Sequence, residues 1–177
     1  KDRSNDAMTK VGLINREGGD NCEAKVEKVN GDLQISIKKV LPKLLDCHYD
    51  IVLSSASPDA PVFVNMAAGK LTVDGIYKSI DVNIGAGSYI FSGSTPIQKI
   101  NMSAGKMKLV YESLAPNGLL QIKANSSKIK GIFPRGSRLN IDSNCSLSNI
   151  KSSFPRSGVS DAFKVIVEGN LVSAKFE

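Results

Sequence analysis

A six-residue pattern recurs along the middle of this chain, and the repetition limits the possible folds more than any other feature. Three close copies, each starting with Val or Ile and ending in Ala-Gly, begin at residues 64, 82 and 100. Two looser copies begin at residues 120 and 139. A fixed short period of this kind is the signature of stacked supersecondary units rather than of one irregular domain.

Each position of the pattern keeps one kind of residue. The first and third positions are apolar in all five copies, which is the spacing of inward-facing residues in a strand. The second position always holds a carboxamide: Asn65, Asn83, Asn101, Gln121 and Asn140. The sixth position holds Gly69, Gly87, Gly105, Asn125 and Asn144. Since Gly and Asn tolerate a positive φ, we expect a corner of the chain at the sixth position.

A second apolar pair follows the corner in the first three copies, so one repeat is strand, corner, strand and turn. A unit of 18–20 residues cannot bury its own apolar face and must stack on its neighbours. We therefore predict an all-β parallel β-solenoid of 18–20 residues per turn, with the carboxamides in a hydrogen-bonded ladder. The alternative is an antiparallel sandwich whose strands are evenly spaced.

The repeats lie inside a longer domain. Residues 1–21 are polar, and we expect them to form a mobile arm. The remaining residues, 22–177, are predicted to be a single domain. We divide this domain into an N-terminal cap, the repeat coils and a C-terminal cap, at residues 22–61, 62–150 and 151–177.

Both caps contain predicted strands. Asn30-Gly31 is flanked by alternating apolar residues and predicts a β-hairpin. A further strand is expected at residues 49–53. Near the other end, residues 163–167 and 170–176 predict two strands that close the stack. Capping strands are expected because each end of a solenoid exposes core and unpaired backbone.

The cysteines suggest one disulfide. Cys22 precedes the hairpin and Cys47 precedes the next strand, so a Cys22–Cys47 bridge is expected, with Cys145 unpaired. The bridge suits an exported protein, and a first residue other than Met suits the removal of an upstream segment. The alternative is three reduced, mostly buried thiols.

The inventory of catalytic residues is small. The chain has one His, His48, and no Gly-x-Ser-x-Gly motif, so a nucleophilic Ser lacks an evident base. Four carboxylates in the repeat region occupy different columns and are not expected to converge: Asp74, Asp81, Glu112 and Asp142. Neither His nor Cys has the spacing of a metal site. We expect no enzyme activity, no metal and no cofactor, and keep a polysaccharide-active enzyme as the third hypothesis.

The repeated [Val/Ile]-Asn-[Met/Ile]-x-Ala-Gly units, preceded by the strand Tyr49–Leu53, resemble the repeats of the adhesin family of bacterial envelope proteins. The match covers roughly residues 47–150 and is strongest in the first three copies. The resemblance implies a right-handed solenoid and an exported, non-enzymatic protein of the periplasm or cell surface. It supplies no catalytic motif to place on this chain.

Positive charge is concentrated in residues 119–164, which hold eight basic and two acidic residues against a net charge of +6 for the whole chain. A basic face is expected from Lys123, Lys128, Lys130, Arg135, Arg138, Lys151 and Arg156. Such a face attracts acidic glycans or other polyanions. Nucleic acid is a less suitable partner because no aromatic residues are interleaved for base stacking, and a merely solvated surface is the alternative. No apolar run is long enough for a membrane span.

The leading functional hypothesis is therefore a non-enzymatic, adhesin-like interaction module of the envelope. A polyanion binder that uses residues 119–164 is the second.

Overall fold

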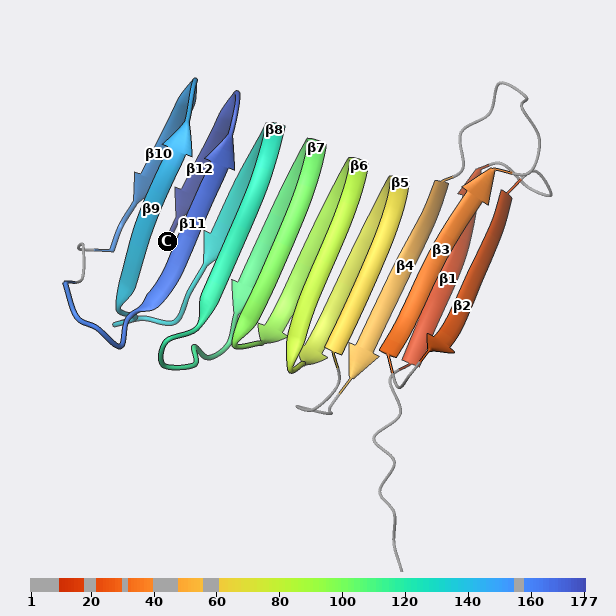
Figure 1. Cartoon of the computed structure of the whole chain (residues 1–177), viewed down its shortest axis with the longest axis horizontal. Helices are drawn as coiled ribbons and strands as arrows, with labels where there is room; N and C mark the ends of the chain where they lie inside the picture. Colours follow the sequence, from red (N-terminus) through yellow and green to blue (C-terminus); the bar gives the residue numbers. More distant parts are fainter. Residues whose placement is uncertain (1–9, 18–21, 30–31, 40–47, 56–60, 155–157) are drawn as a thin grey trace, which may run out of the picture.

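The computed structural model describes residues 10–17, 22–29, 32–39, 48–55, 61–154 and 158–177. These residues form strands joined by turns, with no helix in the described ranges (Figure 1). The strands are β1 (Lys10–Glu17), β2 (Cys22–Val29), β3 (Asp32–Lys39), β4 (His48–Ser55), β5 (Pro61–Ile76), β6 (Ser79–Ser94), β7 (Ile97–Tyr111), β8 (Leu119–Ile132), β9 (Leu139–Cys145), β10 (Ser148–Ser152), β11 (Phe163–Gly169) and β12 (Val172–Phe176).

Strands β5, β6 and β7 are parallel and stack in the register that the repeat predicts. Val64 lies beside Val82, and Val82 lies beside Ile100, so each turn advances the chain by 18 residues. The parallel β-solenoid is thereby confirmed and the antiparallel sandwich is wrong. Equivalent residues of the first three copies are direct neighbours on adjacent turns.

Each long strand bends at its corner and contributes to two layers. The first halves of β5–β8 line up with β3, β11 and β9, and the second halves with β4, β12 and β10. Inward side chains from both layers meet in one apolar core, which includes Val64 and Met66 from one layer and Leu71 and Val73 from the other. Alternation of period two leaves the intervening side chains on the outer face of each layer.

Three of the five predicted corners have the predicted positive φ, whereas Asn125 and Asn144 do not. Gly69, Gly87 and Gly105 have φ values of 136°, 144° and 143°. The turns also approach closely there, because a Cβ added to Gly87 would lie 1.9 Å from the carbonyl oxygen of Gly69. At Gly87 and Gly105, glycine is required both by the dihedral angle and by the space available.

The fourth copy is offset by two residues from its predicted alignment. Ile100 lies beside Ile122 rather than Leu120, so the advance from β7 to β8 is 22 residues. The additional residues are in the connection between the two strands, at residues 112–118. Lys123 and Ser127, rather than Gln121 and Asn125, therefore continue the carboxamide and corner columns. An offset of two residues preserves the inward and outward alternation, so the apolar pattern does not distinguish the two registers.

The end of the chain does not form the predicted C-terminal cap. Strand β11 pairs with β8 on one side and β9 on the other, and β12 lies between β8 and β10. Residues 163–176 therefore form an inner turn, and residues 139–152 form the outermost turn (Figure 1). The strongly apolar β11 buries Phe163, Val165 and Val167, whereas β9 and β10 are mostly exposed, which suits the end of the stack.

The N-terminal hairpin is confirmed, since β2 and β3 are antiparallel with Val29 opposite Asp32. The predicted strand at residues 49–53 lies within β4. The arm prediction is wrong for residues 10–17, which form β1 and pair antiparallel with β4. Strands β1 and β2 thus cover the N-terminal end of the stack, beside the first parallel turn. The rest of the predicted arm, residues 1–9 and 18–21, lies outside the described ranges.

Candidate functional site

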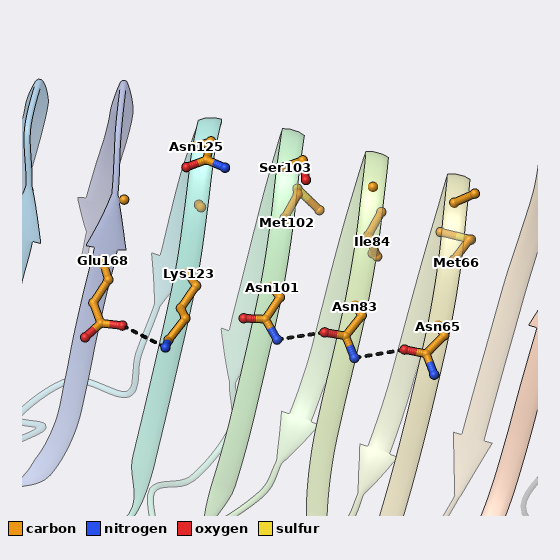
Figure 2. A pocket seen from close by; sticks show the side chains of 14 residues that line it. Asn65, Met66, Asn83, Ile84, Asn101, Met102, Ser103, Lys123, Asn125 and Glu168 are labelled. Carbon is orange, nitrogen blue, oxygen red and sulfur yellow. Dashed lines mark hydrogen bonds and ion pairs between the residues drawn. The ribbon is translucent and has the colours of Figure 1, made fainter.

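The outer face of the first layer carries a row of asparagines. Asn83 donates a hydrogen bond from Nδ2 to Oδ1 of Asn65 at 2.9 Å, and Asn101 donates in the same way to Asn83 at 2.7 Å. The three side chains are exposed and point the same way from consecutive strands (Figure 2). The predicted ladder is confirmed for these three residues, and parallel in-register pairing is its cause.

The row continues with charged residues rather than carboxamides. Lys123 occupies the next position, and Glu168 of β11 follows it, with Nζ and Oε2 3.5 Å apart. Both side chains are more than one third exposed. Beside the row lies an open groove of about 710 Å³, which extends from Asn65 to Glu168 (Figure 2).

The outer face of the second layer carries stacked lysines. Lys108, Lys130, Lys175 and Lys151 are successive neighbours on β7, β8, β12 and β10. In a parallel column, Lys106 lies beside Lys128. All six side chains are exposed, and we call this set the lysine face: Lys106, Lys108, Lys128, Lys130, Lys151 and Lys175.

One carboxylate approaches the lysine face. Lys130 Nζ lies 2.5 Å from Oε1 of Glu177, and Lys175 pairs with the other oxygen of the same carboxylate. Hydrogen bonds from Lys130 and Lys175 lower the pKa of Glu177 from its ordinary 4.5 to about 2. Glu177 is thus ionised at neutral pH and offsets part of the repulsion between its two lysine neighbours.

The predicted basic residues do not form a single face. Lys128, Lys130 and Lys151 belong to the lysine face, whereas Lys123 lies on the outer side of the other layer. Arg135 and Arg138 lie in the connection between β8 and β9, where Arg138 Nη1 is 4.0 Å from Asp161 Oδ1. Arg156 lies outside the described residues.

Sequence reasoning missed Lys106, Lys108 and Lys175 because charge was summed along segments of the chain. Two of them lie before residue 119 and the third lies after residue 164. The signal that points to Lys106 and Lys108 is their outward alternation in β7, which Lys128 and Lys130 repeat in β8. The neighbours of these residues in space depend on the register and on the insertion of β12.

A polar cluster is buried between the layers. Gln98 is fully buried, donates to the Tyr89 hydroxyl at 2.6 Å, and accepts a hydrogen bond from the Tyr111 hydroxyl. Burial raises the pKa of both tyrosines above the ordinary 10. Their hydroxyls remain protonated and satisfy Gln98, so the cluster is part of the core.

Cys145 forms no disulfide. Cys145 is a free thiol whose Sγ lies 3.5 Å from the Val167 carbonyl oxygen. Burial, followed by the nearby charge of Glu168, raises the pKa of the thiol. The predicted Cys22–Cys47 bridge cannot be placed, because Cys47 lies outside the described residues.

The four candidate carboxylates are distributed over the molecule. Asp81 is in the first layer and Asp74 in the second, while Asp142 Oδ2 lies 3.4 Å from Lys164 Nζ. Glu112 begins the connection after β7. Within the described ranges, no group of three or more His, Cys, Asp or Glu residues has the arrangement of a metal site.

Comparisons of this chain with family models, with characterised proteins and with solved structures found no match. Among the described residues there is no helix long and apolar enough to cross a membrane.

Proposed function

We propose that this chain is a non-enzymatic interaction module that binds an acidic polymer through its lysine face. The observation that carries the proposal is the stacking of Lys108, Lys130, Lys175 and Lys151 on four successive turns. Adjacent strands are about 4.8 Å apart, so these ammonium groups form a regular positive row. Like charges directly opposite one another destabilise a sheet, and a bound polyanion relieves that repulsion.

An acidic glycan suits this face better than nucleic acid. On the preceding turns, the column of Lys108 continues with Ile90 and then Thr72, and the column of Lys106 continues with Ser88. Within the described columns there is no aromatic ring on which a base could stack. Carboxylate or sulfate groups along an extended glycan need only point charges, which lysine provides.

We also propose an exported location in the bacterial envelope, at the periplasm or cell surface. The support is the resemblance of the repeats beginning at residues 64, 82 and 100 to the adhesin family. The absence of activity is proposed from the single His of the chain and from the pairing of Asp142, Glu168 and Glu177 with lysines.

Binding of heparin and polygalacturonate tests the proposal. The variant Lys108→Gln/Lys130→Gln/Lys151→Gln removes three charges from the lysine face. A matched control removes three exposed charges elsewhere: Lys78→Gln/Lys99→Gln/Lys123→Gln. We expect the first variant to weaken binding by at least about tenfold, equivalent to 1.4 kcal/mol, and the control to change it by less than threefold.

Equal weakening by the two triple variants would mean that net charge alone attracts the polymer, and the assignment to the lysine face would be rejected. The polygalacturonate samples also test for enzymatic activity. An increase in reducing ends or in unsaturated products over the protein-free sample would contradict a non-enzymatic role.

A further inference from the structure

The groove beside the asparagine row is a second recessed surface, on the layer opposite the lysine face. Its floor is low because the outward positions next to the row hold small residues, Ala67, Gly85 and Ser103. A Cβ added to Gly85 would lie 2.4 Å from the carbonyl oxygen of Ala67. Close packing of the turns therefore keeps the floor bare, and the asparagine side chains stand beside it.

The asparagines retain unused hydrogen-bonding capacity. A carboxamide has two N–H donors and two acceptor lone pairs, and the ladder uses one donor and one acceptor of Asn83. The bonds along the ladder fix the orientation of each side chain, so little entropy remains to be lost when a ligand binds. Paired donors and acceptors thus recur at the strand spacing of about 4.8 Å.

The groove carries little net charge, because Lys123 and Glu168 at the end of the row away from Asn65 neutralise one another. The exposed ring of Phe63 precedes Asn65 by two residues on the same outer face, on the side of the row away from Ala67, and does not line the groove. The groove therefore combines carboxamides, small residues and little net charge, in contrast to the lysine face.

We propose that this groove binds a neutral glycan, whose sugar rings lie along the solenoid axis. The hydroxyls of successive sugars pair with Asn65, Asn83 and Asn101, since a hydroxyl both donates and accepts as a carboxamide does. Orientation by a few polar groups in a largely apolar recess is the general pattern of small-ligand sites.

The test uses neutral hexasaccharides, namely cellohexaose, chitohexaose and maltohexaose, titrated into the whole chain by calorimetry and by NMR. Asn83→Ala removes the central member of the row. Ser103→Leu fills the groove from an exposed position and leaves the ladder intact, so the test remains decisive if Asn83→Ala is unstable. Asn140→Ala, an exposed asparagine of β9 outside the groove, is the matched control.

We expect saturable binding of at least one hexasaccharide, weakened at least tenfold by Asn83→Ala or Ser103→Leu and unchanged by Asn140→Ala. Binding should persist in 0.5 M NaCl and in the lysine-face variant Lys108→Gln/Lys130→Gln/Lys151→Gln, and this persistence separates the groove from the polyanion site. Three outcomes would each overturn the inference: no saturable binding at millimolar sugar, equal weakening by Asn140→Ala, or loss of binding in the lysine variant. None of them bears on binding of an acidic polymer to the lysine face.

Discussion

Replacement of Gly87 by Ala tests the corner geometry that allows the turns to stack. The residue has φ = 144°, and a side chain in this region costs about 1–3 kcal/mol. The new Cβ would also lie 1.9 Å from the Gly69 carbonyl oxygen. Overpacking of this kind costs about 1–3 kcal/mol when the surroundings must move. We therefore expect Gly87→Ala to lower the free energy of unfolding by about 2–6 kcal/mol, the sum of these two costs.

Three other glycines separate the two causes. Gly136 has φ = 79° with nothing within 4 Å of its added Cβ, so Gly136→Ala should cost only about 1–2 kcal/mol for the dihedral angle. Gly85 lacks the positive φ but has a contact of 2.4 Å, so Gly85→Ala should cost about 1–3 kcal/mol for crowding. Gly158 has neither feature, and Gly158→Ala should change stability by less than about 1 kcal/mol.

Urea denaturation followed by far-UV circular dichroism measures the four variants against the parent chain. Because a solenoid can lose its turns in more than one step, the midpoint and slope of each transition are compared before free energies are derived. The reasoning is refuted if Gly87→Ala is no more destabilising than Gly136→Ala. That result would mean that the turns are not in close contact at Gly87.

Three further predictions concern the core, the lysine face and the register. Gln98→Leu should lower the free energy of unfolding by about 2–5 kcal/mol, because two buried tyrosine hydroxyls lose their hydrogen-bond partner. Changing both tyrosines to Phe in the Gln98→Leu chain should recover most of the lost free energy, as measured by urea unfolding. Glu177 has a folded pKa of about 2, below its ordinary 4.5, so its stabilising effect is present above pH 4.5 and is lost as the pH falls through 2. Glu177→Gln should therefore remove this part of the dependence of stability on acid pH. An unchanged midpoint of acid unfolding in that variant would contradict the ion pairs. In a chain whose native cysteines are replaced by Ser, Asn101→Cys should form a disulfide with Lys123→Cys and not with Gln121→Cys. Gel mobility after oxidation measures which pair forms. The reverse preference would mean that β8 is in the register predicted from the repeat, with an advance of 20 residues.

The repeat was sufficient to predict the first three turns but not the fourth. Apolar residues at Val64, Val82 and Ile100, followed by glycine corners at a constant spacing, leave one register for the intervening strands. In β8, Leu120 and Ile122 are both apolar and both buried, so a two-residue offset keeps every inward side chain inward. Only the length of the connection before β8, together with the observed pairing of β8 with β7, decides between the two registers.

The candidate surfaces were predictable to different degrees. The asparagine row follows from the sequence, since its members occupy one column of the close repeats. The lysine face does not, because Lys175 joins Lys130 and Lys151 only through the insertion of β12 between β8 and β10. No local pattern records which strand edge a later segment will occupy.

The sequence by itself determined the solenoid, its glycine corners and the exposed asparagines, because these depend on alternation and backbone dihedral angles within one short repeat. The tertiary structure alone decided the order β8, β11, β9 and hence the four-lysine column. That order depends on which apolar strand gains most by burial between two others. Strand β11 is more apolar than β9, so it occupies the inner place although it comes later in the chain.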